Sequence, residues 1–488
     1  MRLFRTRRAL TLAGAVLAVF VTVAVAAGSA MAHNTGRWVS GDMHTHTFLT
    51  DGSNTEAQVA QKAFGTYGLD WFANSEHGGF SSRDPFGNAV SPSQPRWWSL
   101  RNWSYPVIRD LRPLFPGNTL IQGLEWNAPT HEHVSVGIVS NEPSAVAEFE
   151  YRFDKGDTSS NWPDPAVVKT NKTAADTLAG IAWLQARYAD SAYVVLNHPS
   201  RALSYSAADI RDFLAAGPGV VAGFEGIPGH QREADRGGYG STNPAARCYQ
   251  GVDAWAAKIG GVWDSILANG TPFSIFSNSD FHSTAGDFWP GEYQKNWTFA
   301  DNPHDPKSIV AGLKSGRAFG VQGDLIDGLE FTAESGGEKV AMGDAPIVVR
   351  RGRDVVVNVK FHSPKRNNNA DSPKVDHVDL IAGSVTGPAV KGTASWDATT
   401  NPTARVVRTF GARSIRNLGH GYFSATYVLH DVQGPMYMRL RGTNLPENAP
   451  GKTDANGNPL VDQPGANSAA NAWGSLWFYS NPVWIGVR

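Results

Sequence analysis

Two histidines and an aspartate stand close together in residues 41–52, which read GDMHTHTFLTDG. Side chains alternate along a strand, so His44 and His46 would point to the same side if residues 37–44 form a strand. Two imidazoles at the end of one strand can hold one cation, and Asp51 follows across a tight turn, within reach of a second. An HxH pair alone also fits a polar loop after a strand, so its assignment depends on the rest of the chain.

Strands and helices that would position these residues alternate from Trp38 to about Gly323. Apolar runs predict strands at 37–44, 69–77, 118–126, 133–139, 192–199, 219–227 and 272–280. The sequence also predicts helices at 54–68, 173–189 and 206–217, the last with Ser206 as its N-cap. This alternation is typical of a parallel sheet with helical crossovers, which can close into a barrel.

Histidines and carboxylates gather at the ends of these predicted strands. They are His44, His46, Asp51, His77, Glu125, His133, His198, Asp280 and His282. The loops of a barrel converge at one rim, and that rim is where barrel enzymes have their active sites. Histidine and carboxylate ligands without thiolate suit Zn²⁺, Mn²⁺ or Fe²⁺. The pattern therefore predicts a metal centre rather than scattered polar residues.

Other segments depart from the alternating pattern. Residues 80–117, rich in proline, arginine and aromatics, and the polar residues 141–172 both follow predicted strands. They fit either lids over the site or ordinary surface packing. The later part of the chain predicts mainly strands, at 354–363, 376–385, 404–411, 421–431, 434–444 and 475–487. We therefore expect a barrel domain at 33–327 and an all-β, sandwich-like domain at 328–488.

Residues 1–32 have the composition of an export signal. Four arginines precede an apolar run at about 9–27, and Ala-Met-Ala at 30–32 fits a cleavage site. The arginine pair at 7–8 also resembles a twin-arginine signal. An uncleaved membrane anchor is the alternative, because the apolar run is nearly long enough to span a bilayer. We expect cleavage, a secreted or extracytoplasmic protein, and no membrane segment afterwards.

Charge and cysteine content argue against a nucleic-acid-binding protein and against a disulfide-stabilised one. Removal of residues 1–32 would change the formal charge from -1 to about -5. No basic run elsewhere predicts a nucleic-acid or anionic-membrane surface. Cys248 is the only cysteine, so a disulfide framework is excluded and this residue is expected to be small and buried. The sequence does not indicate an oligomeric state.

The opening motif resembles that of the PHP (polymerase and histidinol phosphatase) superfamily, usually HxH followed by Ser-Asp-Gly. The segments SEHGG, GLEW, HVSVG, NHPSR and SDFH match its remaining motifs in order, across residues 38–325. The resemblance implies a distorted (β/α)7 TIM-like barrel, up to three divalent metals and hydrolysis of phosphoesters. The motif order, with GRAFGVQGDLI and WFYSNPVWI, is most similar to an exported branch near the carbaryl hydrolases, which split a carbamate ester.

The resemblance also implies a role for each ligand. The first metal would be bound by His44, His46, Glu125 and Asp280, the second by His133 and His198 with Glu125 bridging, and the third by Asp51, His77 and His282. His133 is preferred to His131, because the superfamily's histidine precedes an apolar strand that ends in glycine. The chain departs from the usual motifs at Glu76, where aspartate is common, and at Thr50, where serine is common.

This ligand set implies a reaction without a serine nucleophile. Two cations about 3.5–4 Å apart can share one hydroxide, lower its pKa and clamp the oxygens of an ester. Glu125, Asp280 and His198 are the expected catalytic ligands. Asp42 is expected to accept an N–H from a ligand imidazole, and Glu76 to be a supporting carboxylate beside its neighbouring histidine.

Substrate contacts are less constrained by the sequence. Arg201 follows a predicted ligand by three residues and could meet an anionic oxygen. His230, Arg232 and Arg236 follow a predicted strand at the same rim, and each also fits an ordinary surface salt bridge.

We therefore expect an exported, metal-dependent phosphoesterase that acts on small organic esters. A carbamate or carboxylic ester hydrolase with the same metals is the alternative. A metal-bearing binding protein is a second alternative, which the full ligand set and the loop-rich rim disfavour.

Overall fold

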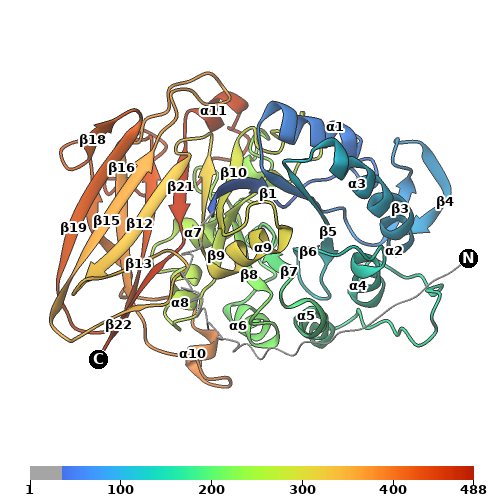
Figure 1. The fold of residues 1–488 in the computed structure, drawn as a ribbon, viewed down its shortest axis with the longest axis horizontal. Coiled ribbons are helices and arrows are strands. Elements are labelled where there is room, and N and C mark those ends of the chain that lie inside the picture. The colour runs from blue at the N-terminus through green and yellow to red at the C-terminus, as the bar shows by residue number, and fades with distance from the viewer. Residues whose placement is uncertain (1–35) are drawn as a thin grey trace, which may run out of the picture. The chain divides into compact units, whose positions relative to one another are not determined.

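The computed structural model describes residues 36–488, so the predicted export signal at 1–32 lies outside the described residues. The described chain is a mixed α/β structure with a 15-stranded sheet, a five-stranded sheet and a two-stranded sheet (Figure 1). None of its helices has both the length and the apolar character needed to cross a membrane.

Seven neighbouring strands of the large sheet carry the predicted ligands or lead to them. In sheet order they are β1 (Arg37–Asp42), β2 (Trp71–Asn74), β5 (Thr119–Asn127), β6 (His133–Ile138), β7 (Ala192–Leu196), β8 (Val221–Ile227) and β9 (Ser274–Ser277). Each coincides with a predicted strand. A parallel bridge pairs Thr45 with Phe281, so the segments that follow β1 and β9 meet.

The prediction of a uniformly parallel sheet is wrong at β6, which runs antiparallel to both β5 and β7. Only residues 128–132 connect β5 to β6, and so short a connection permits a hairpin but no crossover helix. The reversal places His133 at the amino end of β6, where it pairs with Asn127 at the carboxyl end of β5. His133 therefore reaches the same rim as the other ligands by the opposite strand direction.

The predicted helices are confirmed. They are α1 (Glu56–Ala60) with its continuation η1 (Gln61–Thr66), α5 (Ala174–Tyr188) and α6 (Ala207–Ala216). The Ser206 hydroxyl accepts the Asp209 N–H at 3.1 Å, as expected of an N-cap. Shorter helices follow at α7 (Ala254–Ala257), α8 (Val262–Leu267) and α9 (Pro306–Ser315), with single 3₁₀ turns η4 (Arg236–Gly238) and η5 (Pro244–Ala246).

Alternating side chains of β7 belong to two different apolar cores. In β7, Val194 and Leu196 belong to the cluster that includes residues of α5 and α6, whereas Tyr193 and Val195 belong to a separate cluster with residues from β1, β2 and β8. All five residues of β7 are buried. A strand that is apolar on both faces is typical of a sheet covered on both sides.

The two interrupting segments contain regular structure of their own. Residues 80–117 form the hairpin β3 (Phe80–Arg83) and β4 (Ala89–Pro95), followed by α2 (Arg96–Ser99), η2 (Leu100–Ser104), α3 (Tyr105–Leu111) and η3 (Arg112–Leu114). Residues 141–172 contain α4 (Ala145–Phe153).

The large sheet continues beyond the seven strands into the C-terminal part of the chain. From β1 it passes to β10 (Gln294–Ala300), β11 (Ala318–Gln322), β21 (Trp477–Ser480), β20 (Met436–Thr443), β22 (Val483–Val487) and β14 (Ile347–Val349). In addition, β16 (His377–Ser384) pairs with β20, and β17 (Arg405–Phe410) pairs with β16. The boundary at 327/328 therefore stays a prediction.

A second sheet packs against this extension. Its order is β13 (Glu338–Ala341), β12 (Gly328–Ser335), β15 (Arg353–His362), β19 (Tyr422–Val432) and β18 (Arg416–Gly419). Val357 of β15, Leu380 of β16 and Leu440 of β20 belong to one buried cluster, so both sheets share a core. The short helices α10 (Ala394–Asp397) and α11 (Ala469–Trp473) lie in loops. The predicted C-terminal strands are thus present.

Candidate metal centre

All nine predicted ligands meet in overlapping groups of side chains that could each hold a cation. Four of these groups contain all nine: His44, His46, Glu125 and Asp280; His46, Asp51, His77 and His282; His77, Glu125 and His133; and Glu132, His133 and His198. The first coincides with the predicted first site, and the second contains the predicted third site. The predicted second site is divided between the last two groups, which adds Glu132, a residue that the sequence reasoning missed.

The first group is buried and tightly convergent. The Nε2 atom of His44 lies 3.1 Å from both Glu125 Oε1 and Asp280 Oδ1. The Nε2 atom of His46 lies 3.4 Å from Glu125 Oε2 and 3.3 Å from Asp280 Oδ1. Separations near 3 Å between donor atoms are those of neighbouring ligands on one small cation.

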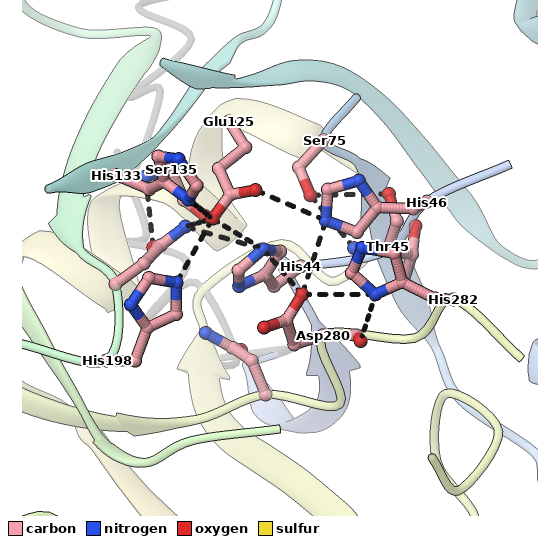
Figure 2. Close-up of polar contacts among 12 residues, drawn as sticks. His44, Thr45, His46, Ser75, Glu125, His133, Ser135, His198, Asp280 and His282 are labelled. Atoms are coloured by element: carbon pink, nitrogen blue, oxygen red, sulfur yellow. Dashed lines mark hydrogen bonds and ion pairs between the residues drawn. The ribbon is translucent and has the colours of Figure 1, made fainter. Parts of the chain in front are cut away.

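Glu125 lies at the centre of the cluster. Figure 2 shows its carboxylate between His133 and His198 on one side and His46 on the other. Its Oε1 atom is 3.0 Å from His133 Nδ1 and 3.3 Å from His198 Nε2. Its Oε2 atom is 2.8 Å from His77 Nδ1. Each carboxylate oxygen therefore faces a different set of imidazoles, as a residue shared by two cations requires.

The third predicted set lies at the mouth of the site. Asp51 Oδ2 is 3.5 Å from His77 Nε2, and Asp51 Oδ1 is 3.2 Å from His282 Nε2. The His46 ring stacks on His282 with centroids 4.0 Å apart. Asp51 is the most exposed of the ligands, with 57% of its side chain accessible, whereas His46 is fully buried.

Several nitrogen and oxygen atoms of the cluster are buried and free to bind a metal ion. His46 Nε2, Glu125 Oε2, His133 Nδ1, His198 Nδ1 and Asp280 Oδ1 are all buried without a hydrogen-bond partner. Buried polar atoms are costly unless they are satisfied, and the exceptions in a folded protein call for an explanation. Divalent cations bound by these atoms would satisfy them.

The pKa values of clustered side chains are shifted because imidazoles and carboxylates lie close together. Burial alone would lower the pKa of His44, but Asp280, Glu125 and Glu225 raise it well above its ordinary value. Burial would raise the pKa of Glu125, yet the facing imidazoles, led by His133, hold it well below its ordinary value. A cation must displace protons from such imidazoles, so metal binding should strengthen as the pH rises.

Glu225 of β8 is a supporting carboxylate that the sequence reasoning missed. Its Oε1 atom lies 2.7 Å from His44 Nδ1 and accepts the Asn278 side-chain amide at 2.8 Å. Its Oε2 atom accepts the backbone N–H of His198 at 3.0 Å. Glu225 therefore orients two predicted ligands. The signal was present in the sequence, because a glutamate stands in the buried run VAGFEGI.

Asp42 does not have the role expected of it. Its carboxylate accepts the backbone N–H groups of His44 and Ser279, each at 3.0 Å, and no imidazole. Both acceptors of this short side chain face the backbone of the two ligand-bearing loops, which leaves the imidazole to the longer Glu225 arm. Burial raises the pKa of Asp42 to about 7 despite these bonds.

Glu76 supports the first motif and contacts no ligand imidazole directly. It accepts the Thr47 backbone N–H at 3.0 Å and the side-chain amide of Asn74 at 3.0 Å. The hydroxyls of Thr47 and Thr50 also donate to it. The longer glutamate arm and Thr50, the two departures from the usual motifs, therefore contact each other.

His133, and not His131, joins the cluster. The His131 ring stacks on Tyr205 with centroids 5.5 Å apart, and its Nδ1 lies 2.9 Å from the Pro129 carbonyl oxygen. This histidine, which belongs to the β5–β6 connection, directs its Nε2 atom at Asp209 Oδ1, 3.5 Å away.

A cavity of about 460 Å³ opens over the cluster, and Arg201 and His230 both line it. The Arg201 guanidinium is held by Glu132 Oε1 at 3.0 Å. The prediction of a substrate contact is wrong for Arg236, which is buried and donates to Gln231 at 2.7 Å and to the Tyr293 hydroxyl at 2.6 Å.

Arg232 is not among the residues that line this cavity. Its guanidinium lies over the Phe288 ring, 5.4 Å from the centroid.

Comparisons with known proteins add little to this geometry. No protein-family model matches the chain, and no curated protein matches it. Among solved structures, it is similar to a two-domain protein from Bacteroides vulgatus ATCC 8482 that contains a predicted PHP-like metal-dependent phosphoesterase. The two share 12% identity with a TM-score of 0.36, over 87% of this chain and 94% of that one. So low a score carries no assignment, and the site rests on the chain's own residues.

Proposed function

We propose that the chain is a metal-dependent phosphoesterase of the PHP superfamily, with a distorted (β/α)7 barrel at 33–327 and an all-β domain at 328–488. The observation that carries the proposal is the position of Glu125, whose two oxygens face separate sets of imidazoles from four strands or their loops. The seven neighbouring strands, with the bridge between Thr45 and Phe281, support the barrel.

In the proposed hydrolysis, different residues of the chain have different roles. Divalent cations bound here would activate water and polarise the ester, so that no protein nucleophile is needed. Glu125 joins the donor groups, Asp280 directs one oxygen at His44 and His46, and His198 faces Glu125. Arg201 lines the cavity with a permanent positive charge that could bind an anionic substrate oxygen.

The cavity wall favours a small, polar ester. Of its 13 lining residues, Ala285 alone has an aliphatic side chain, and none is phenylalanine, tyrosine or tryptophan. Such a wall offers little apolar surface to a naphthyl carbamate, whereas its histidines and Arg201 could bind the oxygens of a phosphoester. The narrower resemblance to the carbaryl hydrolases stays a prediction.

We further propose that residues 1–32 are an export signal, so that the mature protein starts near His33 outside the cytoplasm. N-terminal sequencing of secreted protein tests this proposal. Retention of residues 9–27 would indicate a membrane anchor instead.

The function is tested by elemental analysis of the purified mature protein together with a panel of nitrophenyl phosphates, phosphodiesters and naphthyl carbamates. We expect three divalent cations per chain, because the donor groups offer places for three, and turnover of a phosphoester. Turnover of carbamates alone would favour the alternative ester hydrolase. Full metal content without hydrolysis of any ester would favour a binding protein.

A further inference from the structure

The loop after β8 places one more imidazole beside the predicted ligands. The Nε2 atom of His230 lies 3.0 Å from Asp280 Oδ2, and its Nδ1 atom lies 2.6 Å from Asp287 Oδ1. His230, Asp280 and His282 form a donor group that could hold one cation. Asp280 thus directs one oxygen at the first donor group and the other at His230.

His230 repeats the arrangement of two predicted ligands. His44 has Glu225 at its Nδ1 and faces carboxylates of the cluster with Nε2. His282 has its Nδ1 2.9 Å from the Asp280 carbonyl oxygen and its Nε2 facing Asp51. An acceptor at Nδ1 fixes the proton there and leaves the Nε2 lone pair for a cation. In His230, Asp287 is the acceptor.

The backbone brings His230 against Asp280 at the cost of strain. His230 has a φ of 53°, in the left-handed region that non-glycine residues rarely adopt. A Cβ atom on the preceding Gly229 would lie 2.1 Å from the Asp280 Cβ, so only glycine permits this approach. The His230 carbonyl accepts the N–H groups of Glu233 at 3.2 Å and Gly237 at 3.1 Å. Strain that is held in place by its surroundings is typical of functional sites.

We propose that His230 is a tenth metal ligand, which binds through Nε2 the cation that it shares with Asp280 and His282, and that Asp287 orients its imidazole. The proposal concerns metal binding and does not depend on which ester is cleaved. The alternative is a protonated His230 that only donates a hydrogen bond to Asp280. The two differ in whether an imidazole is required or any N–H donor suffices.

The test compares two variants with the full mature protein. His230→Asn removes the imidazole with a residue that tolerates positive φ but is shorter. His230→Gln keeps an N–H group that can reach Asp280. Co²⁺ binding is measured by equilibrium dialysis with elemental analysis, and the visible absorption of the bound Co²⁺ reports its coordination.

We expect one Co²⁺ to bind at least about 100-fold more weakly in both variants, since even supporting residues of metal sites change affinity by about 10–100-fold. The absorption spectrum should change as well. His131→Asn is the matched control, because it removes a buried histidine that belongs to none of the donor groups described above. It should bind Co²⁺ as the wild type does.

Wild-type affinity and absorption in His230→Gln would overturn the proposal, because a hydrogen-bond donor would then suffice. Unchanged binding in His230→Asn would overturn it too. Either result with a metal-loaded wild type refutes only the role of His230, whereas a wild type that binds no Co²⁺ refutes the metal centre as a whole.

Discussion

Replacement of Glu125 by glutamine is the most direct test of the shared carboxylate. The change keeps the shape of the side chain and replaces one oxygen by an NH₂ group. The Asn197 side-chain amide donates to Oε1 at 2.9 Å, so the glutamine carbonyl should take that place. The NH₂ group would then face His46 and His77, where Oε2 now lies 3.4 Å and 2.8 Å from their ring nitrogens.

This orientation determines which cations are lost. The acceptor that faces His133 and His198 survives in Glu125→Gln, while the side that faces His46 loses both its charge and its lone pairs. Metal at the first donor group should therefore weaken more than metal near His133. Without a carboxylate common to two cations, hydrolysis should fall by at least about two to three orders of magnitude, or roughly 3–4 kcal/mol of transition-state stabilisation.

The assay measures metal content at a defined free metal concentration and kcat/KM with a nitrophenyl phosphate. Glu330→Gln is the control, because it removes the same charge at an exposed position in β12, where Glu330 pairs with Lys360 and belongs to none of the donor groups described above. Its metal content should be unchanged. If Glu125→Gln retains its cations and near-native turnover, the assignment of Glu125 as a carboxylate shared by two cations is wrong. The reaction then has to be assigned to Asp51, His77 and His282.

Three further results are expected. Burial opposes protonation of His77, but Glu125 and Asp51 raise its pKa to about 10. This stabilises the metal-free fold fully below about pH 6.5 and is lost as the pH rises towards 10. In chelator, the thermal midpoint of the wild type should thus approach that of His77→Gln over this range, and a constant gap would contradict the assignment. Arg201→Ala should raise KM with full metal content, measured by kinetics and elemental analysis, and a fall in kcat alone would exclude anion binding. Glu225→Gln should weaken metal binding by about 10–100-fold in equilibrium dialysis, because it releases a ligand imidazole; wild-type affinity would show that this carboxylate is dispensable.

Much of the site could be predicted because ligand types and strand ends are local features of the sequence. His44 and His46 follow β1, which ends at Asp42, and both direct Nε2 at Asp280 Oδ1; His198 and Asp280 likewise follow buried apolar runs. Once the strands are neighbours in one sheet, their ends meet at one rim. The choice of His133 over His131 rests on the resemblance, because the superfamily's histidine precedes an apolar strand that ends in glycine, and β6 begins at His133.

The direction of each strand, in contrast, could not be predicted from the apolar pattern. Apolar periodicity is the same for parallel and antiparallel neighbours, so β6 was expected to run parallel like the others. The information lay in the connection, since residues 128–132 are too few for a crossover. Loop length, and not strand pattern, therefore decides how His133 reaches the rim.

Supporting carboxylates depend on contacts between distant segments, which a motif does not contain. Asp42 stands two residues before His44, yet its carboxylate bonds to backbone N–H groups of His44 and Ser279. The imidazole is held instead by Glu225, which lies 181 residues further along the chain. A glutamate in a strand buried on both faces cannot remain unpartnered. That requirement alone predicts a polar partner for Glu225, and only the packing of β8 beside the loop after β1 identifies the partner as His44.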